Sequence, residues 1–207
     1  MFFCPLPAEL TAIPIANCLL DFGQWQKIAI QRLRKEDGTV NEIDIATTDP
    51  KLLATWAALK AATDNTKVVV SPLIEAVEST PGEKREFGGG NATVGGQVRI
   101  LGSNPSTMQG MIRSKRQDVI AAMKTYGHDN VGIFAINEYG QIGGIVDDQE
   151  TPTKFSPIPI QSFFIGDLKF GGYEAPDENA ISWSYAANFS DGFQAITPTD
   201  FKSNLDL

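Results

Sequence analysis

The chain has 207 residues, 42% hydrophobic and 20% charged, a composition that supplies a sizeable core and is not that of a disordered protein. Its 17 basic and 25 acidic side chains give a net charge of −8, which argues against tight binding of DNA or RNA phosphates. No apolar run approaches the roughly 20 residues that cross a bilayer. We therefore expect a soluble protein with one structural domain over residues 1–207.

The N-terminal segment is apolar and interrupted by prolines. It fits neither a helical nor a strand period, so we predict an extended arm over about residues 1–23. No basic residues precede its apolar stretches, and we expect no signal peptide. Cys4 and Cys18 do not complete a zinc site, because no histidine lies near them. We favour two buried thiols made in a reducing cytoplasm over a disulfide between them.

Residues 25–77 predict strands around one short helix. The segments with strand-like alternation or β-branched residues are 25–33, 40–45, 67–70 and 73–77, with an Asp37-Gly38 turn between the first two. Asp49 is a suitable N-cap and Pro50 suits the first turn of a helix that ends at about Ala62.

Residues 78–97 have the composition of a long loop, with Gly88-Gly89-Gly90 and Gly95-Gly96 after a charged stretch. Loops of this length inside a compact domain are usually functional or disordered. Two interpretations are open: a flexible linker, or an arm that becomes ordered on a neighbouring subunit. A P-loop is excluded, because no Gly-Lys-Ser/Thr sequence opens a helix there.

The second half predicts one long helix followed by strands. The helix spans Pro105 to Tyr126 and ends at Gly127, with its apolar residues at helical spacing. One predicted strand, 97–101, precedes the helix, and the strands predicted after it are 131–136, 141–146, 157–165, 168–170 and 179–189. The tail, about residues 197–207, is polar, and we expect it to extend away from the body.

Candidate catalytic residues are scarce. His128 lies beside Asp129 in a predicted turn, where polar residues are common, and no nucleophile motif accompanies it. We expect no enzyme activity and assign no catalytic, cofactor-binding or metal-binding residue.

Two charged clusters have structural explanations. The segment Asp147-Asp148-Gln149-Glu150 lacks the spacing of a calcium loop and is interpreted as a solvated loop. For Arg113, Lys115 and Arg116 we favour salt bridges within or between subunits over contacts with nucleic acid, because the chain is acidic.

In chain order, these features resemble the tail tube (major tail) proteins of long-tailed bacteriophages and the related tube proteins of contractile injection systems. The features that carry the resemblance are the strand–loop–strand unit Val68 to Leu101, the helix Pro105 to Tyr126, the hairpin Val131 to Val146 and the alternating strand Asn179 to Phe189.

The resemblance implies a mainly β (α+β) fold, in which two antiparallel sheets form a barrel-like sandwich with a flanking long helix and a second short helix. It also implies a virion protein, made in the host bacterial cytoplasm, that assembles with copies of itself and other virion proteins. Hexameric rings would stack through the long loop and the termini into a tail tube. DNA would pass through its acidic lumen without tight binding.

Two alternatives are open. One is another virion structural protein, such as a tail terminator, a head–tail completion protein or a capsid-stabilising protein. The other is a carbohydrate-binding β-sandwich module that uses exposed Trp25, Trp183 or Tyr185. Trp183 and Tyr185 share a strand face with Ile181, which favours a place in the core.

Overall fold

The computed structural model of the chain describes residues 22–207. The predicted N-terminal arm lies almost entirely outside the described residues, and so do Cys4 and Cys18. The strands are β1 (Trp25–Arg32), β2 (Ile43–Asp44), β3 (Val68–Val70), β4 (Glu75–Thr80), β5 (Lys84–Gly88), β6 (Val98–Ser103), β7 (Ser106–Arg113), β8 (Val131–Asn137), β9 (Ile142–Val146), β10 (Lys154–Ser156), β11 (Ile158–Lys169), β12 (Glu178–Tyr185) and β13 (Phe193–Ile196). The helices are α1 (Leu53–Ala61) and α2 (Gln117–Lys124), with short 3₁₀ turns η1 (Gly90–Ala92), η2 (Val94–Gly96), η3 (Thr125–His128) and η4 (Phe189–Gly192).

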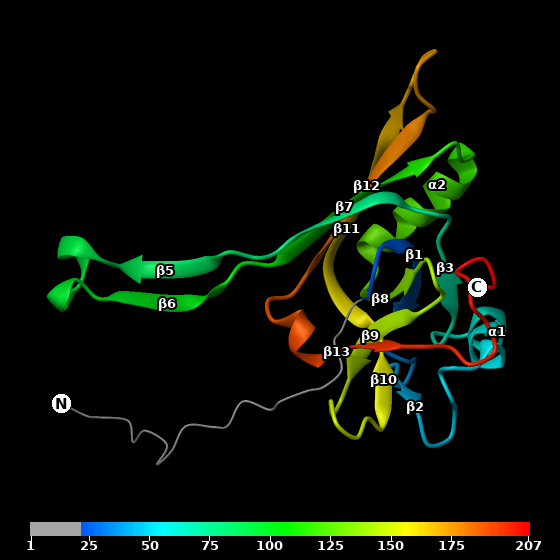
Figure 1. Cartoon of the computed structure of the whole chain (residues 1–207), viewed down its shortest axis with the longest axis horizontal. Helices are drawn as coiled ribbons and strands as arrows, with labels where there is room; N and C mark the ends of the chain where they lie inside the picture. Colours follow the sequence, from blue (N-terminus) through cyan, green and yellow to red (C-terminus); the bar gives the residue numbers. More distant parts are fainter. Residues whose placement is uncertain (1–21) are drawn as a thin grey trace.

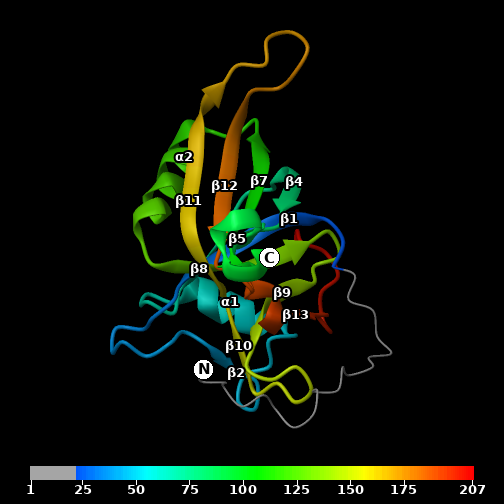
Figure 2. The same cartoon turned by 90° about the vertical axis from the view of Figure 1, so that its left-hand side faces the viewer.

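Eleven strands form one antiparallel network that is divided into two layers (Figures 1 and 2). The order is β2–β10–β9–β8–β11–β12–β7–β4, with β1 beside β8, β3 beside β1 and β13 beside β9. β11 connects the layers, because Ile158 and Pro159 pair with β8 while the rest of the strand pairs with β12. The mainly β fold with two antiparallel sheets in a sandwich is thus confirmed, although the described strands leave it open and do not close a barrel.

The core lies on both faces of the central strands β1 and β8. Side chains alternate across a strand, so Ile28 and Ile30 enter one hydrophobic cluster while Ala29 between them enters the other. The first cluster fills the space between the two sheets and α2, and the second is covered by α1 and the C-terminal segment. Because both faces of β8 are covered, all seven of its residues are buried.

The aromatic residues considered for glycan binding belong to the core. Trp183 and Tyr185 are 1% and 0% exposed, and the partly buried Trp25 stacks on Trp183 with ring centroids 6.4 Å apart. Burial raises the pKa of the Tyr185 phenol far above its usual range, because water no longer solvates the charged form. These rings therefore do not form an exposed platform on which a carbohydrate could stack.

The predicted helix from Pro105 to Tyr126 is wrong in its first half. Residues 106–113 form strand β7, which pairs with β12 and β4, and the helix α2 begins only at Gln117. Met108 and Ile112 are four residues apart, a spacing that fits a helix face and also one face of a strand. Gly110, a poor helix former, lies between them and packs closely on Ile74.

The predicted loop at residues 78–97 is also wrong. β4 continues to Thr80, β5 follows at Lys84, and the glycines with positive φ turn the tip of a hairpin that returns through β6. The hairpin projects far from the body as a two-stranded ribbon (Figure 1).

Two smaller expectations are corrected. After the Asp37-Gly38 turn the chain forms only one isolated bridge, between Val40 and Arg34 just beyond the end of β1, and β2 then pairs with β10 instead of β1. The C-terminal tail does not extend away: Phe201 and Leu207 are 5% and 8% exposed and belong to the second core cluster.

Candidate assembly surface

The structure does not build a catalytic site around His128. The imidazole is exposed at the end of η3, and the neighbouring Asp129 instead pairs with Arg32, with Oδ2 3.4 Å from the guanidinium. Within residues 22–207 no group of His, Cys, Asp and Glu side chains could hold a metal ion. The same residues contain no helix that is long and apolar enough to cross a membrane.

The acidic segment at residues 147–150 stabilises its own loop. The Asp147 carboxylate accepts hydrogen bonds from the Thr153 hydroxyl and from the backbone N–H groups of Thr153 and Lys154, and these bonds hold the Asp147 pKa well below its usual range. Asp148 accepts from the N–H groups of Glu150 and Thr151. These carboxylates satisfy a turn, as expected for a solvated loop.

The basic cluster also has partners within its own chain. Arg113, the last residue of β7, pairs with Glu75 at 2.7 Å and with Glu178 at 3.5 Å. Arg116, the residue before α2, pairs at 2.7 Å with Asp118 in the first turn of that helix. The expectation of salt bridges is confirmed for these two arginines, whereas Lys115 is exposed in the segment between β7 and α2.

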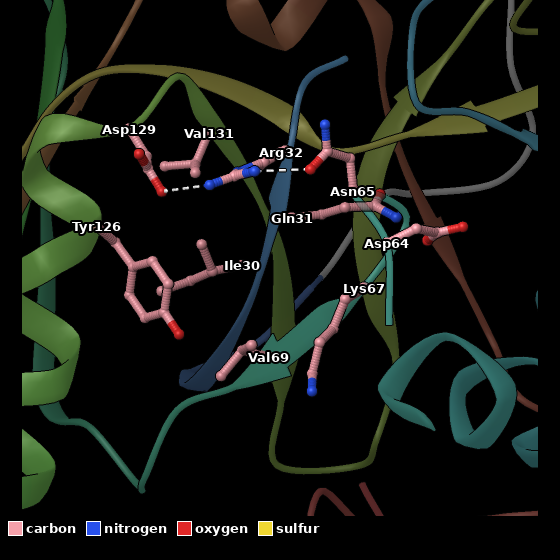
Figure 3. Close-up of a pocket in the computed structure, with 10 residues that line it drawn as sticks. All are labelled: Ile30, Gln31, Arg32, Asp64, Asn65, Lys67, Val69, Tyr126, Asp129 and Val131. Atoms are coloured by element: carbon pink, nitrogen blue, oxygen red, sulfur yellow. Dashed lines mark hydrogen bonds and ion pairs between the residues drawn. The ribbon is translucent and has the colours of Figure 1, made fainter. Parts of the chain in front are cut away.

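A recess of about 320 Å³ opens between β1, β3 and η3 (Figure 3). Its lining residues are Ile30, Gln31, Arg32, Asp64, Asn65, Lys67, Val69, Tyr126, Asp129 and Val131. Arg32 is held at the rim by Asn65 Oδ1 at 2.6 Å and by Asp129, so its charge is already paired. No serine or cysteine nucleophile stands beside a histidine base among these lining residues, and we assign the recess no chemistry.

The most unusual surface is the projecting hairpin, which we call the arm and define as residues 81–105. The Asn104 N–H donates to the Glu83 carbonyl at 2.8 Å and thereby joins the β4–β7 ladder to the β5–β6 ladder. At this crossing a Cβ on Gly82 would lie 1.8 Å from the Asn104 carbonyl oxygen, so the ribbon needs glycine there. The strand pair β5–β6 of the arm thus continues the pair β4–β7 of the body.

The arm exposes large apolar side chains on both of its faces. Their exposed fractions are 55% for Phe87, 99% for Val94, 52% for Val98, 68% for Ile100 and 63% for Leu101. An isolated two-stranded ribbon is marginally stable in water, and one that bears apolar side chains gains stability when another surface covers it. The arm therefore has the properties of an interface segment.

The sequence predicts one strand of the arm and misses the other. The strand expected at residues 97–101 corresponds to β6, whereas residues 84–88, which form β5, were expected to be part of the loop. Lys84–Gly88 contains three charged residues and a glycine with a single apolar side chain, a composition typical of a loop.

A second projection, the connection between β11 and β12, also bears exposed aromatic residues. Phe170 is 78% exposed, and Tyr173 is fully exposed. The connection itself projects beyond the body (Figure 1). It extends from the sheet layer that also carries the arm, and it is a further candidate contact.

Comparisons with known proteins give little beyond this geometry. No protein-family model matches the chain, and no curated protein matches it. Among solved structures, the chain is similar to one in the virion of a native gene transfer agent particle, at 14% identity and a TM-score of 0.33, over 60% of this chain and 85% of the other. It is also similar to one in the tail of an empty gene transfer agent particle with C6 symmetry, at 14% identity and a TM-score of 0.32, over 61% and 82%. TM-scores of this size do not establish a shared fold, so we argue the function from the chain's own surface.

Proposed function

We propose that this protein is a structural subunit of a phage-like virion that assembles with copies of itself into stacked, hexameric rings and so forms a tail tube. The observation that carries the proposal is the arm, whose apolar side chains remain exposed among residues 22–207. Projections of this kind are suited to contact a neighbouring subunit, and assembly protects their free strand edges.

The charge of the chain supports a role as a conduit for DNA. A subunit of net charge −8 repels phosphates, so a tube of such subunits would let DNA slide without gripping it. Tight DNA binding by the assembled protein at moderate salt would contradict this part of the proposal.

The test measures the mass of the purified chain by light scattering, with negative-stain images of the same sample. We expect hexameric rings or stacked tubes with an open channel. The triple variant Phe87→Ser, Ile100→Ser, Leu101→Ser should remain folded and lose the stacked species, because it removes the apolar contact surface of the arm.

A matched control replaces two exposed apolar residues outside the arm, Val40→Ser and Leu205→Ser, and should assemble like the wild type. A wild-type chain that stays monomeric at high concentration would overturn the proposal. Rings that never stack would instead support a terminator or head–tail completion role.

A further inference from the structure

The arm has one face that combines arginine with apolar side chains. Paired residues of a ladder share a face, and Phe87 pairs with Arg99 while Arg85 pairs with Gly102. A register shift leaves Leu101 as an unpaired extra residue next to these pairs. Arg85 and Phe87 are two positions apart on one strand, so Arg85, Phe87 and Arg99 share one face, and we call this surface the arginine face.

The two arginines of this face differ from the other arginines. Residues 22–207 contain six, and four of them (Arg32, Arg34, Arg113 and Arg116) donate to a carboxylate, amide or carbonyl oxygen of the same chain. Arg85 and Arg99 have no such acceptor within residues 22–207. Lys84, on the opposite face, is paired with Glu86. Two guanidinium groups on the same face as Phe87 are thus available for an external partner.

The overall charge points to a second copy as that partner. The arm holds three basic and two acidic side chains, so the rest of the chain carries a net charge of −9. A guanidinium binds a carboxylate with two parallel hydrogen bonds, and an interface between complementary charges gains both specificity and rate of association. The arm is therefore complementary in sign to the body from which it projects.

One part of the body offers carboxylates without basic partners. The β9–β10 loop carries Asp148 and Glu150, and η4 carries Asp191. Gln149 Nε2 joins the two segments by donating to the carbonyl oxygens of Asp191 at 3.2 Å and Phe193 at 3.3 Å. None of the three carboxylates forms an ion pair within residues 22–207, and backbone N–H groups of Thr151 and Glu150 hold the Asp148 pKa below its usual value. We call this surface the acidic end.

We propose that the arginine face of one copy docks on the acidic end of a second copy, with Arg85 and Arg99 bound to carboxylates and with Phe87 covered. This inference rests on the proposed self-assembly and names its contact. The arm points away from its own body (Figure 1), so the contact joins two different patches of two copies. Such head-to-tail interfaces close into rings or continue as stacks.

The experiment uses the full chain and measures the protein concentration of half-assembly by light scattering. Raising NaCl from about 0.1 M to about 1 M shortens the Debye length from about 10 Å to about 3 Å and should raise this concentration. The charge reversals Arg85→Glu/Arg99→Glu and Glu150→Lys/Asp191→Lys should each raise it at least about tenfold. The control Lys115→Glu/Lys202→Glu makes the same change in net charge as the arginine reversal, outside the arm, and should leave it unchanged.

The decisive variant combines the two charge reversals in one chain. Copies that carry both pairs of changes restore opposite signs across the contact and should assemble near the wild-type concentration. Assembly that is insensitive to salt and to the arginine reversal, but is lost in the apolar triple variant, would overturn the charged contact and leave the proposed function standing. Reversals that each weaken assembly without mutual rescue would overturn the choice of the acidic end. A wild type that never assembles would overturn both proposals.

Discussion

At the scale of single residues, Gly110 shows why residues 106–113 are a strand. It lies on the buried face of β7, where a Cβ would meet Ile74 Cγ2 at 2.7 Å and Val77 Cγ2 at 3.2 Å. Ile74 is 1% exposed and cannot move into solvent without opening the core. We therefore predict that Gly110→Ala lowers the free energy of unfolding by about 1–3 kcal/mol, measured by urea denaturation.

The control for this prediction is Gly166→Ala in β11. A Cβ there would meet its nearest atoms at 3.7 Å, an ordinary van der Waals contact, and the free energy should change by no more than about 0.5 kcal/mol. Equal effects of the two substitutions would show that the close packing at Gly110 does not limit stability.

At the scale of elements, the C-terminal segment completes α1 and the second core cluster. The Asp200 carboxylate accepts from the Leu53 N–H at 2.8 Å and so caps the first turn of α1. Lys60 Nζ donates to the Leu207 carbonyl at 2.9 Å near the other end. Because the Phe201 ring is buried beside these contacts, we predict that Phe201→Ala costs about 3–5 kcal/mol in thermal or urea unfolding.

Leu205, four residues later and 72% exposed, provides the comparison. Leu205→Ala should leave the unfolding curve within about 0.5 kcal/mol of the wild type. If Phe201→Ala were equally harmless, the tail would not be part of the folding unit.

At the scale of the whole molecule, the arm and the body have separate tasks. None of residues 84–102 belongs to either core cluster. We predict that replacing residues 84–102 with a two-residue Asn-Gly turn keeps the free energy of unfolding within about 0.5 kcal/mol of the wild-type value and abolishes stacking. Urea denaturation and light scattering of the same preparation check both parts. Loss of stability together with assembly would mean that the arm supports the fold.

Much of the sheet followed from local patterns in the sequence. Strand β1, the hairpin of β8 and β9, the alternating β12 and the short helix α1 were predicted from periodicity and turn residues, and the structure confirms that these elements exist. Two bounds were wrong: α1 begins at Leu53 with Leu52, not Asp49, at its N-cap, and β12 ends at Tyr185 rather than at Phe189. Patterns with period two are informative when one face is buried, as in Ile181, Trp183 and Tyr185. The candidate assembly segment was recognised by its length and glycines, and its returning strand β6 was predicted, but β5 and the arginine face were not.

The sequence by itself determined the class of the fold, the acidic surface and the special character of residues 78–97, because composition and short-range periodicity carry these properties. The tertiary structure decided three further points. Met108 and Ile112 fit a helix and a strand equally well, and only pairing with β12 and β4 selects the strand. Phe201 and Leu207 look like parts of a polar tail until α1 and β8 provide a core for them to enter. The common face of Arg85 and Arg99 depends on the ladder register, since residues so far apart in the chain are brought together only by strand pairing.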